Sequence, residues 1–197
     1  MYPNQKGIAQ MSVAALPIVK FPQADHFHLR TWLPSDVGAL EETTHDPYIS
    51  LITTLPNVFD ETEMKAWIDR QLQRRDEGIG YSMCIADNLR NQMLGMIGLW
   101  LTELVYGRAR IGYWLLPSAR GHGIAISALQ LVTRWAFTTF PEIARIELVI
   151  EPNNTPSIRT AERANFSQEG LLHSYQALGK TRRDFYMYSC IRSDEIQ

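Results

Sequence analysis

The chain has 197 residues, of which 45% are hydrophobic and 20% charged, and its formal net charge is −2 at pH 7. This composition is typical of one folded domain and excludes a disordered chain. The near-zero charge excludes the basic surface of a nucleic-acid binder and a polybasic membrane patch, and no run reaches the roughly 20 apolar residues of a membrane helix. We therefore expect neither nucleic acid nor a membrane as a partner.

Residues 1–24 lack periodicity and contain three prolines, which predicts an extended N-terminal arm before a single domain over residues 25–197. Pro17 interrupts the mildly apolar start of the chain, so no signal peptide is expected. Cys84 and Cys190 lie in apolar, strand-like runs. Buried, reduced thiols of this kind are typical of the cytoplasm, which is the expected location.

Alternation and helical spacing predict the elements of the first half of the chain. In order they are a strand over 26–32, a helix over 34–44, a helix from Asp60 with the apolar face Met64, Trp67, Ile68 and Leu72, and a hairpin of 81–86 and 93–101. Asp60 and Glu63 resemble a capping box at the start of the second helix.

The second half predicts a strand over 109–116, a helix to about 140, a strand over 143–150, a helix over 156–164, and strands over 166–178 and 185–191 around Gly179. Asn165 suits the left-handed position that ends a helix. Hairpins followed by a strand–helix–strand crossover predict an α/β fold, with a mixed sheet and helices on both faces.

The turn Arg120-Gly121-His122-Gly123-Ile124-Ala125 joins a buried strand to an amphipathic helix. Backbone N–H groups at a helix N-terminus have no intrahelical partners, and the helix dipole there favours an anion. Glycine lets the main chain approach phosphate oxygens without a Cβ in the way. This stretch therefore predicts a site for a phosphorylated ligand, although a tight turn without a ligand is an equal alternative on this motif alone.

Three phosphate-binding motifs were compared with this turn. A P-loop requires Lys and Ser or Thr where Ile124 and Ala125 stand, and a dinucleotide fingerprint requires a third glycine where Ile126 stands. The pattern Arg/Gln-x-x-Gly-x-Gly/Ala, which binds the pyrophosphate of coenzyme A, is matched by Arg120, Gly123 and Ala125.

Other motifs surround this turn in a fixed order. They are Gly95-Met96-Ile97-Gly98-Leu99, Ile111-Gly112-Tyr113-Trp114-Leu115, Pro152–Arg159, Asn165-Phe166, Glu169-Gly170 and Gly179–Asp184. From about His28 to Ile191 the chain resembles the GNAT superfamily of N-acetyltransferases, and within it the Rim-type branch that acetylates ribosomal-protein N-termini. Several linked motifs are far more specific than any one of them.

The resemblance implies a mostly antiparallel seven-stranded sheet, splayed between its fourth and fifth strands, with acetyl-CoA as acetyl donor. The pantetheine arm would bond to the backbone of the fourth strand, from about Tyr113. The implied positions for acetyl-CoA are Trp114, Leu115, Leu116, Arg120, Gly121, His122, Gly123, Ile124, Ala125, Asn154 and Ser157. No Cys/His cluster exists in the sequence, so no metal is expected.

The family motif assigns a catalytic role to Ser157, which would bond the CoA sulfur or protonate the leaving thiolate; the alternative role is helix capping together with Asn154. Many GNAT enzymes carry a tyrosine where this chain has Ala161, and some Rim-type enzymes a glutamate base where it has Gln176. An amide takes up no proton, so these two positions leave the base undefined.

Glu103 and Glu147 are the remaining acidic candidates for catalysis. Glu103 follows the third predicted strand, and Glu147 interrupts an apolar strand, where a solvent-facing side chain is the more common explanation. Catalysis without a dedicated base, by positioning of an already neutral amine, is a further alternative.

The expected acceptor is a primary amine, first a protein N-terminal α-amine and second a small molecule such as a polyamine, an amino acid or an amino sugar. The alternative is a non-catalytic acyl-CoA sensor, suggested by Ala161 and Gln176. The apolar, unperiodic stretch 46–59 is either a wall of the acceptor site or a homodimer contact.

Overall fold

The sheet of the computed structural model, which describes residues 14–194, has the strand order β1-β2-β3-β4-β5-β7-β6. Its strands are β1 Phe27–Arg30, β2 Gly80–Asp87, β3 Met93–Trp100, β4 Arg108–Leu115, β5 Arg145–Ile150, β6 Ser167–Leu178 and β7 Thr181–Ile191. Neighbouring strands are antiparallel except β4 and β5, which are parallel. The α-helices are α1 Pro47–Ile52, α2 Glu61–Asp76, α3 Ile124–Thr139 and α4 Thr155–Arg163.

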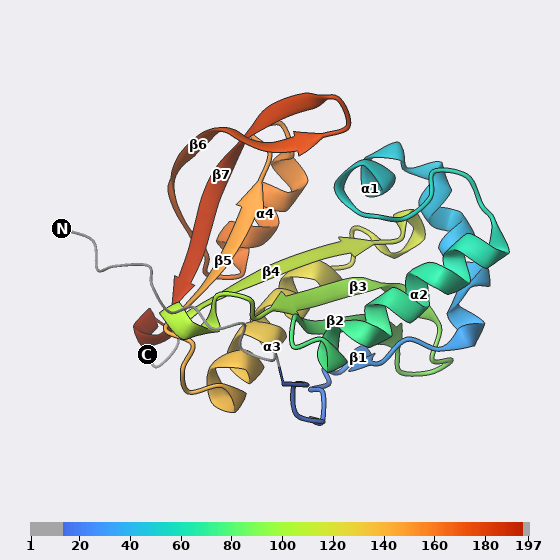
Figure 1. Ribbon diagram of the computed structural model, residues 1–197, viewed down its shortest axis with the longest axis horizontal. Coiled ribbons are helices and arrows are strands. Elements are labelled where there is room, and N and C mark those ends of the chain that lie inside the picture. Colours follow the sequence, from blue (N-terminus) through green and yellow to red (C-terminus); the bar gives the residue numbers. More distant parts are fainter. Residues whose placement is uncertain (1–13, 195–197) are drawn as a thin grey trace.

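Strands β4 and β5 pair over only three positions. The last pair is Arg110 with Glu147, although β4 continues to Leu115 and β5 to Ile150. The two strands start together and then diverge (Figure 1). The splayed, mostly antiparallel sheet implied by the family resemblance is thus confirmed.

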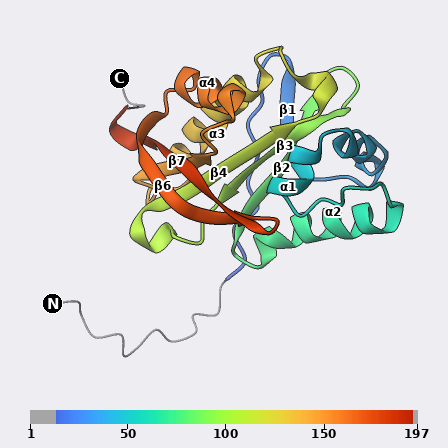
Figure 2. The same cartoon turned by 90° about the horizontal axis from the view of Figure 1, so that it is seen from above.

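The helices cover both faces of the sheet, with α3 and α4 on one side and α1 and α2 on the other (Figure 2). Two clusters of buried side chains correspond to these faces. The first includes Ile111, Leu129 and Ile146, and the second is built around Trp32, Trp67 and Trp114. Alternate residues of β4 therefore belong to different cores, because successive side chains of a strand point to opposite faces.

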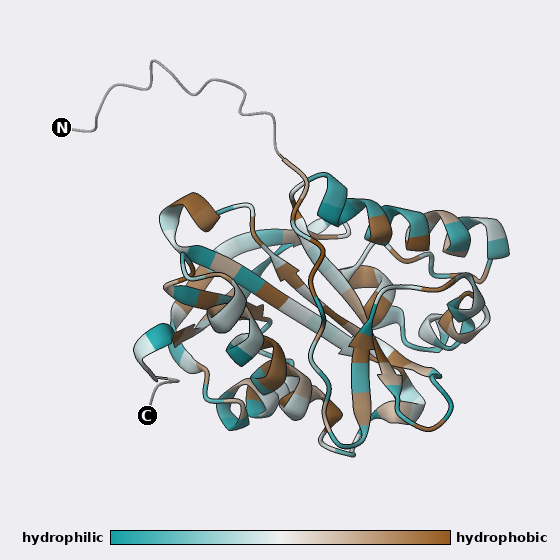
Figure 3. Cartoon of the chain, turned by 90° about the horizontal axis from the view of Figure 1, so that it is seen from below, coloured by the Kyte–Doolittle hydropathy of each residue, from teal (hydrophilic) through white to brown (hydrophobic). Residues whose placement is uncertain are grey.

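Helix α2 begins as the sequence predicts. Asp60 is its N-cap, and the Asp60 carboxylate accepts a hydrogen bond of 2.9 Å from the Glu63 N–H. Hydrophobic stripes lie on the side of α2 towards the sheet and polar residues on its outer side (Figure 3). The expected apolar face is wrong at Leu72, which is 40% exposed. Gln71 is buried instead, with its amide bonded to the Trp67 carbonyl and the Ser82 hydroxyl.

Two other boundaries differ from the sequence prediction. Residues 34–44 form short 3₁₀ turns, Pro34–Asp36 and Gly38–His45, in place of one α-helix. The Asp36 carboxylate accepts from the Leu33 N–H and binds Arg30, which fixes a tight first turn. The last strand begins at Thr181, before the expected residue 185, because the Gly179 turn lets pairing start directly at Leu178 and Thr181.

The described part of the predicted arm packs on its own chain. The Leu16 N–H donates to the Arg75 carbonyl, and the Pro17 carbonyl accepts from the Tyr81 hydroxyl. The Phe21 ring lies edge-on against Tyr81. Residues 1–13 of the predicted arm lie outside the described residues.

Candidate active site

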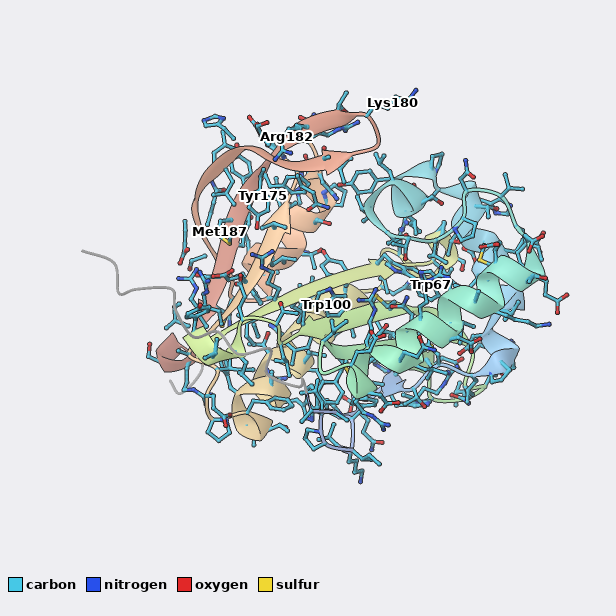
Figure 4. All side chains as sticks on the ribbon, in the orientation of Figure 1. Trp67, Trp100, Tyr175, Lys180, Arg182 and Met187 are labelled. Atoms are coloured by element: carbon cyan, nitrogen blue, oxygen red, sulfur yellow. The ribbon has the colours of Figure 1, made fainter. Side chains whose placement is uncertain are left out.

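A cavity of about 540 Å³ lies where β4 and β5 separate. Its walls come from the α1 region, α2, β3, β4, β5, the start of α4 and the β6–β7 hairpin. Trp67 of α2 and Trp100 of β3, both labelled in Figure 4, belong to its lining. The volume is in the range of small-molecule sites.

The turn before α3 has the geometry of an anion site. Gly121 and Gly123 adopt left-handed φ angles of 84° and 75°. A Cβ added at either glycine would meet no atom within 4 Å, so the backbone borders open space. Helix α3 starts at Ile124 without a side-chain cap, which leaves the N–H groups of its first turn available to a ligand. The residues present thus fit a pyrophosphate.

Arg120 is held away from this open space. Its Nε and Nη2 atoms donate to the Leu115 carbonyl at 3.2 and 3.0 Å, and Nη2 lies 2.6 Å from the Asp46 carboxylate. The guanidinium therefore joins the end of β4 to the first turn of α1. What the turn offers an anion is its backbone at Gly121, His122 and Gly123.

Of the residues around the end of β4 that were expected to contact acetyl-CoA, Tyr113 and Trp114 line the cavity, and Leu115 and Leu116 do not. The Leu115 carbonyl is taken by Arg120, and the Leu116 N–H donates to the Leu94 carbonyl at 2.9 Å. The cavity is instead lined by Gly112, Tyr113 and Trp114. These residues follow the last β4–β5 pair, so they lie beside the splay.

Asn154 and Ser157 both line the cavity at the start of α4. Asn154 is the N-cap, and its carbonyl oxygen accepts from the Ser157 N–H at 3.2 Å. The capping interpretation therefore describes Asn154 and the Ser157 backbone. The Ser157 hydroxyl instead faces the phenol of Tyr113.

Tyr113 is a functional candidate whose side chain no motif indicated, since only its backbone was expected to contact the pantetheine arm. Burial raises the pKa of Tyr113, against the opposing effect of hydrogen bonds with the Ser157 and Thr160 hydroxyls. Ala161, where related enzymes carry a tyrosine, is fully buried. The phenol of Tyr113 thus extends from β4 to the start of α4. In the sequence, only the alternation of side chains along β4 indicates the face of the sheet on which this phenol lies.

Neither acidic candidate lines the cavity. Glu147 is only 5% exposed, so the expectation of a solvent-facing strand residue is wrong. Its carboxylate lies 3.0 Å from Arg145 Nε and 3.8 Å from Arg110 Nε. Glu103 lies 3.4 Å from Arg108 and 3.7 Å from Arg110.

These ion pairs surround the three positions where β4 and β5 still pair. They balance charge at the closed end of the splay.

Tyr48 is a second residue that the sequence analysis did not single out for chemistry. It lines the cavity, and burial raises the pKa of Tyr48 to about 12, with hydrogen bonds to Asn154 and Glu151 as further influences. The Glu151 carboxylate is 3.0 Å from Arg183. The stretch 46–59 therefore contributes to the cavity wall, one of the two roles expected for it.

Residues 14–194 contain no group of three or more His, Cys, Asp and Glu side chains that could hold a metal ion. In the same part of the chain no helix is both long and apolar enough to cross a membrane.

Comparison with known proteins identifies the class to which this fold and cavity belong. The acetyltransferase (GNAT) domain family matches residues 26–167. The chain therefore belongs to the GNAT family.

An uncharacterised N-acetyltransferase, p20 of Bacillus licheniformis, is 28% identical over 166 residues, which cover 84% of this chain and 93% of that protein. The ribosomal-protein-serine acetyltransferase of Escherichia coli is 29% identical over 112 residues, covering 57% and 62%. The structure of the ribosomal-protein α-N-acetyltransferase RimL with coenzyme A superposes with a TM-score of 0.76 at 24% identity, covering 88% of this chain and 98% of that one.

The family and its relatives make this chain an acetyl-CoA-dependent N-acetyltransferase, with acetyl-CoA as the acetyl donor. The comparisons therefore support an enzyme over a non-catalytic acyl-CoA sensor. Ribosomal-protein acetyltransferases occur among its relatives and structural neighbours, which confirms the resemblance to the Rim-type branch.

Proposed function

We propose that this enzyme acetylates the α-amine of a protein or peptide N-terminus. The ribosomal-protein acetyltransferases among its relatives support this acceptor over a small-molecule amine. The cavity supports it independently, through the kinds of side chain that line it.

The observation that carries the proposal is the absence of a base in the cavity wall. Among the described residues that line the cavity, none is Asp, Glu, His or Lys. An α-amine, with a pKa of about 7.7–8.0, is partly neutral at physiological pH, whereas a lysine amine, at about 10.4, is almost wholly charged. A wall without a base therefore favours an α-amine.

Different residues of the chain would bind acetyl-CoA and assist the transfer of its acetyl group. Acetyl-CoA supplies a thioester whose acetyl group passes to the amine nitrogen while the CoA thiol leaves. The turn at Gly121–Gly123 would hold the pyrophosphate, and the β4 backbone at Gly112–Trp114 would bond the pantetheine arm and the thioester carbonyl. The Ser157 and Tyr113 hydroxyls supply hydrogen-bond donors beside them. Water takes the proton that the amine loses and supplies one to the departing thiolate, so that CoA leaves as the free thiol.

A panel of acceptors tests this proposal. With acetyl-CoA, we expect thiol release on peptides that have a free serine N-terminus, and none on the same peptides N-acetylated but carrying a lysine. The pH profile of kcat/KM should follow the pKa of the acceptor amine, because no Asp, Glu, His or Lys is among the described residues that line the cavity. Activity on the lysine peptide alone would contradict the proposal.

Gln176 gives a sharper version of the test, since it lines the cavity where some related enzymes carry a glutamate. Gln176→Glu should raise kcat/KM by roughly tenfold or more below neutral pH, because a positioned base contributes about 10²–10⁴-fold in other enzymes. Gln176→Leu is the matched control and should bring no such gain. Equal activities of the two variants would contradict the proposal that the reaction lacks a base at this position.

A further inference from the structure

Arg74 of α2 is the cavity residue whose charge is least compensated. It lines the cavity and is half-buried, and none of the ion pairs in the described part of the chain includes it. The other cation of the lining, Arg110, lies between Glu103 and Glu147 at 3.7 and 3.8 Å. Arg74 is thus the cation of this wall that has no ion-pair partner within 4 Å in the described part of the chain, and Glu77 acts on it only from a longer distance.

The guanidinium of Arg74 is held in a defined orientation. Its Nε donates to the Gln71 side-chain carbonyl at 2.8 Å, and its central carbon lies 5.5 Å from the Trp100 ring centroid. Gln71 is itself buried and accepts a second hydrogen bond from the Ser82 hydroxyl at 3.1 Å. The Nη groups of Arg74 take no part in these contacts, so a planar fork of donors remains for a ligand.

Two further donors in the same cavity have no acceptor. The indole N–H groups of Trp67 and Trp114 are buried, and neither has a hydrogen-bond partner among residues 14–194. Both rings line the cavity, 6.3 Å apart between centroids, and they are 2% and 5% exposed. A buried N–H without a partner is costly, which indicates that a ligand group satisfies it.

Trp67, Gln71 and Arg74 lie at intervals of four and three residues, which places them on one face of α2. We call this face the α2 wall. It offers N–H donors and a cation, and burial lowers the pKa of Arg74, with the charge of Glu77 acting in the opposite direction and that of Arg70 in the same direction. The complementary ligand is an anion rich in acceptor oxygens.

We propose that the α2 wall binds a carboxylate of the acceptor, so that the enzyme prefers amines with a nearby carboxylate over neutral or polycationic amines. This inference rests on the proposed acetylation of an amine in the same cavity. A single guanidinium fork beside aromatic rings suits a planar carboxylate, whereas a phosphate dianion would require a second uncompensated cation. The carboxylate can belong to an acidic side chain near a peptide N-terminus or to a free amino acid.

Matched acceptors test the preference. Wild-type kcat/KM should be about tenfold higher for a peptide beginning Ser-Glu than for one beginning Ser-Gln, as expected for a charge-assisted hydrogen bond. Spermidine should be a poor acceptor. Free serine against serinamide tests the second source of the carboxylate. These wild-type ratios require no variant.

Arg74→Gln should bring the Ser-Glu to Ser-Gln ratio close to one, and Arg74→Lys, which keeps the charge without the fork, should give an intermediate ratio. Arg70→Gln is the matched control, because Arg70 is exposed on the same helix and does not line the cavity. It should keep the wild-type ratio. Calorimetric titration with CoA verifies that each variant is folded.

The outcomes separate the two proposals. Equal rates on Ser-Glu and Ser-Gln peptides, a preference that survives Arg74→Gln, or a preference for spermidine would overturn the carboxylate site and leave peptide acetylation standing. Acetylation of free serine but of neither peptide would refute the peptide acceptor and support the carboxylate site.

Discussion

The Arg120 guanidinium lies 2.6 Å from the Asp46 carboxylate and joins the turn before α3 to the start of α1. The other carboxylate oxygen of Asp46 accepts from the Tyr48 N–H at 3.0 Å and so caps α1. Tyr48 in turn contacts Asn154 and Glu151 beyond β5. Helix α1 is thus held on both sides of the splay, by Asp46 on the β4 side and by Tyr48 on the β5 side.

Variants at Asp46 should separate its two contacts. Asp46→Asn keeps a capping oxygen and loses the ion pair, so we expect a loss of at most about 1 kcal/mol in the free energy of unfolding, because Arg120 is partly exposed. Asp46→Ala also loses the cap, which costs roughly 1 kcal/mol more. Urea denaturation measures both. Equal stabilities of the two variants would show that Asp46 does not cap α1.

Gly123→Asp should separate ligand affinity from stability. Gly123 is the N-cap of α3, and a side chain added there would enter open space. The variant should therefore fold, with some strain from the left-handed φ of 75°. Its carboxylate would repel the pyrophosphate, and we expect the affinity for CoA to fall by roughly 10–100-fold.

Gly123→Asn is the control, since it has the same shape and tolerates the same φ without the charge. Calorimetric titration with CoA compares the two variants. Unchanged affinity in a folded Gly123→Asp protein would mean that the pyrophosphate binds elsewhere.

Local patterns made much of the fold predictable. The Asp60 cap and the left-handed Asn165, with φ of 66°, follow from short sequence signals that tertiary contacts do not override. The splay between β4 and β5 came from the family resemblance, because nothing in the sequence of either strand marks where the two strands stop pairing and begin to part. Periodicity alone does not distinguish these two situations.

The site was less predictable, because its walls join residues far apart in the chain. Tyr48 meets Asn154 and Glu151 about one hundred positions later, and no spacing rule relates them. Glu147 looked like a surface residue because its partner Arg110 is brought to it only by the parallel pairing. Its other partner, Arg145, is two residues earlier on the same strand and does not by itself indicate burial. The motif for the turn before α3 depends on adjacent residues only, and the left-handed Gly121 and Gly123 fit the anion site that it predicts.

Glu169 should make stability depend on pH. The Glu169 carboxylate accepts from Arg145 and from the Ser189 hydroxyl, both at 2.6 Å, and these bonds, the one from Arg145 first, lower the pKa of Glu169 below its ordinary 4.5. A pKa lowered by folding stabilises the protein above the unfolded value, and this contribution is lost as the pH falls through the folded value.

Glu169→Gln should therefore be less stable than wild type at about pH 7, and the difference should be lost at an acid pH below the lowered pKa of Glu169. Urea midpoints at both pH values measure it. Ser167→Ala, an exposed change on the same strand, is the control. A difference that persists in acid would show that packing, and not the charge, accounts for the effect.

Tyr113 and Ser157 should act as one hydrogen-bond donor pair in the cavity. Because burial raises the pKa of Tyr113 above its ordinary 10.0, the phenol stays protonated throughout the working range of the enzyme. Tyr113→Phe and Ser157→Ala should each lower kcat by roughly tenfold or more, as expected when a hydrogen bond to a developing charge is lost. The kcat of the double variant should be close to that of the less active single variant, because the effects of groups that act as a unit are not additive.

Tyr106→Phe is the matched control for loss of a phenol hydroxyl, because Tyr106 is 72% exposed and does not line the cavity. It should leave kcat unchanged. The KM for acetyl-CoA should change less than kcat in the cavity variants, since the hydroxyls act on the reacting end and the turn at Gly121–Gly123 holds the pyrophosphate. Fully additive losses would mean that the two hydroxyls contribute independently, and a change confined to KM would place them in binding alone.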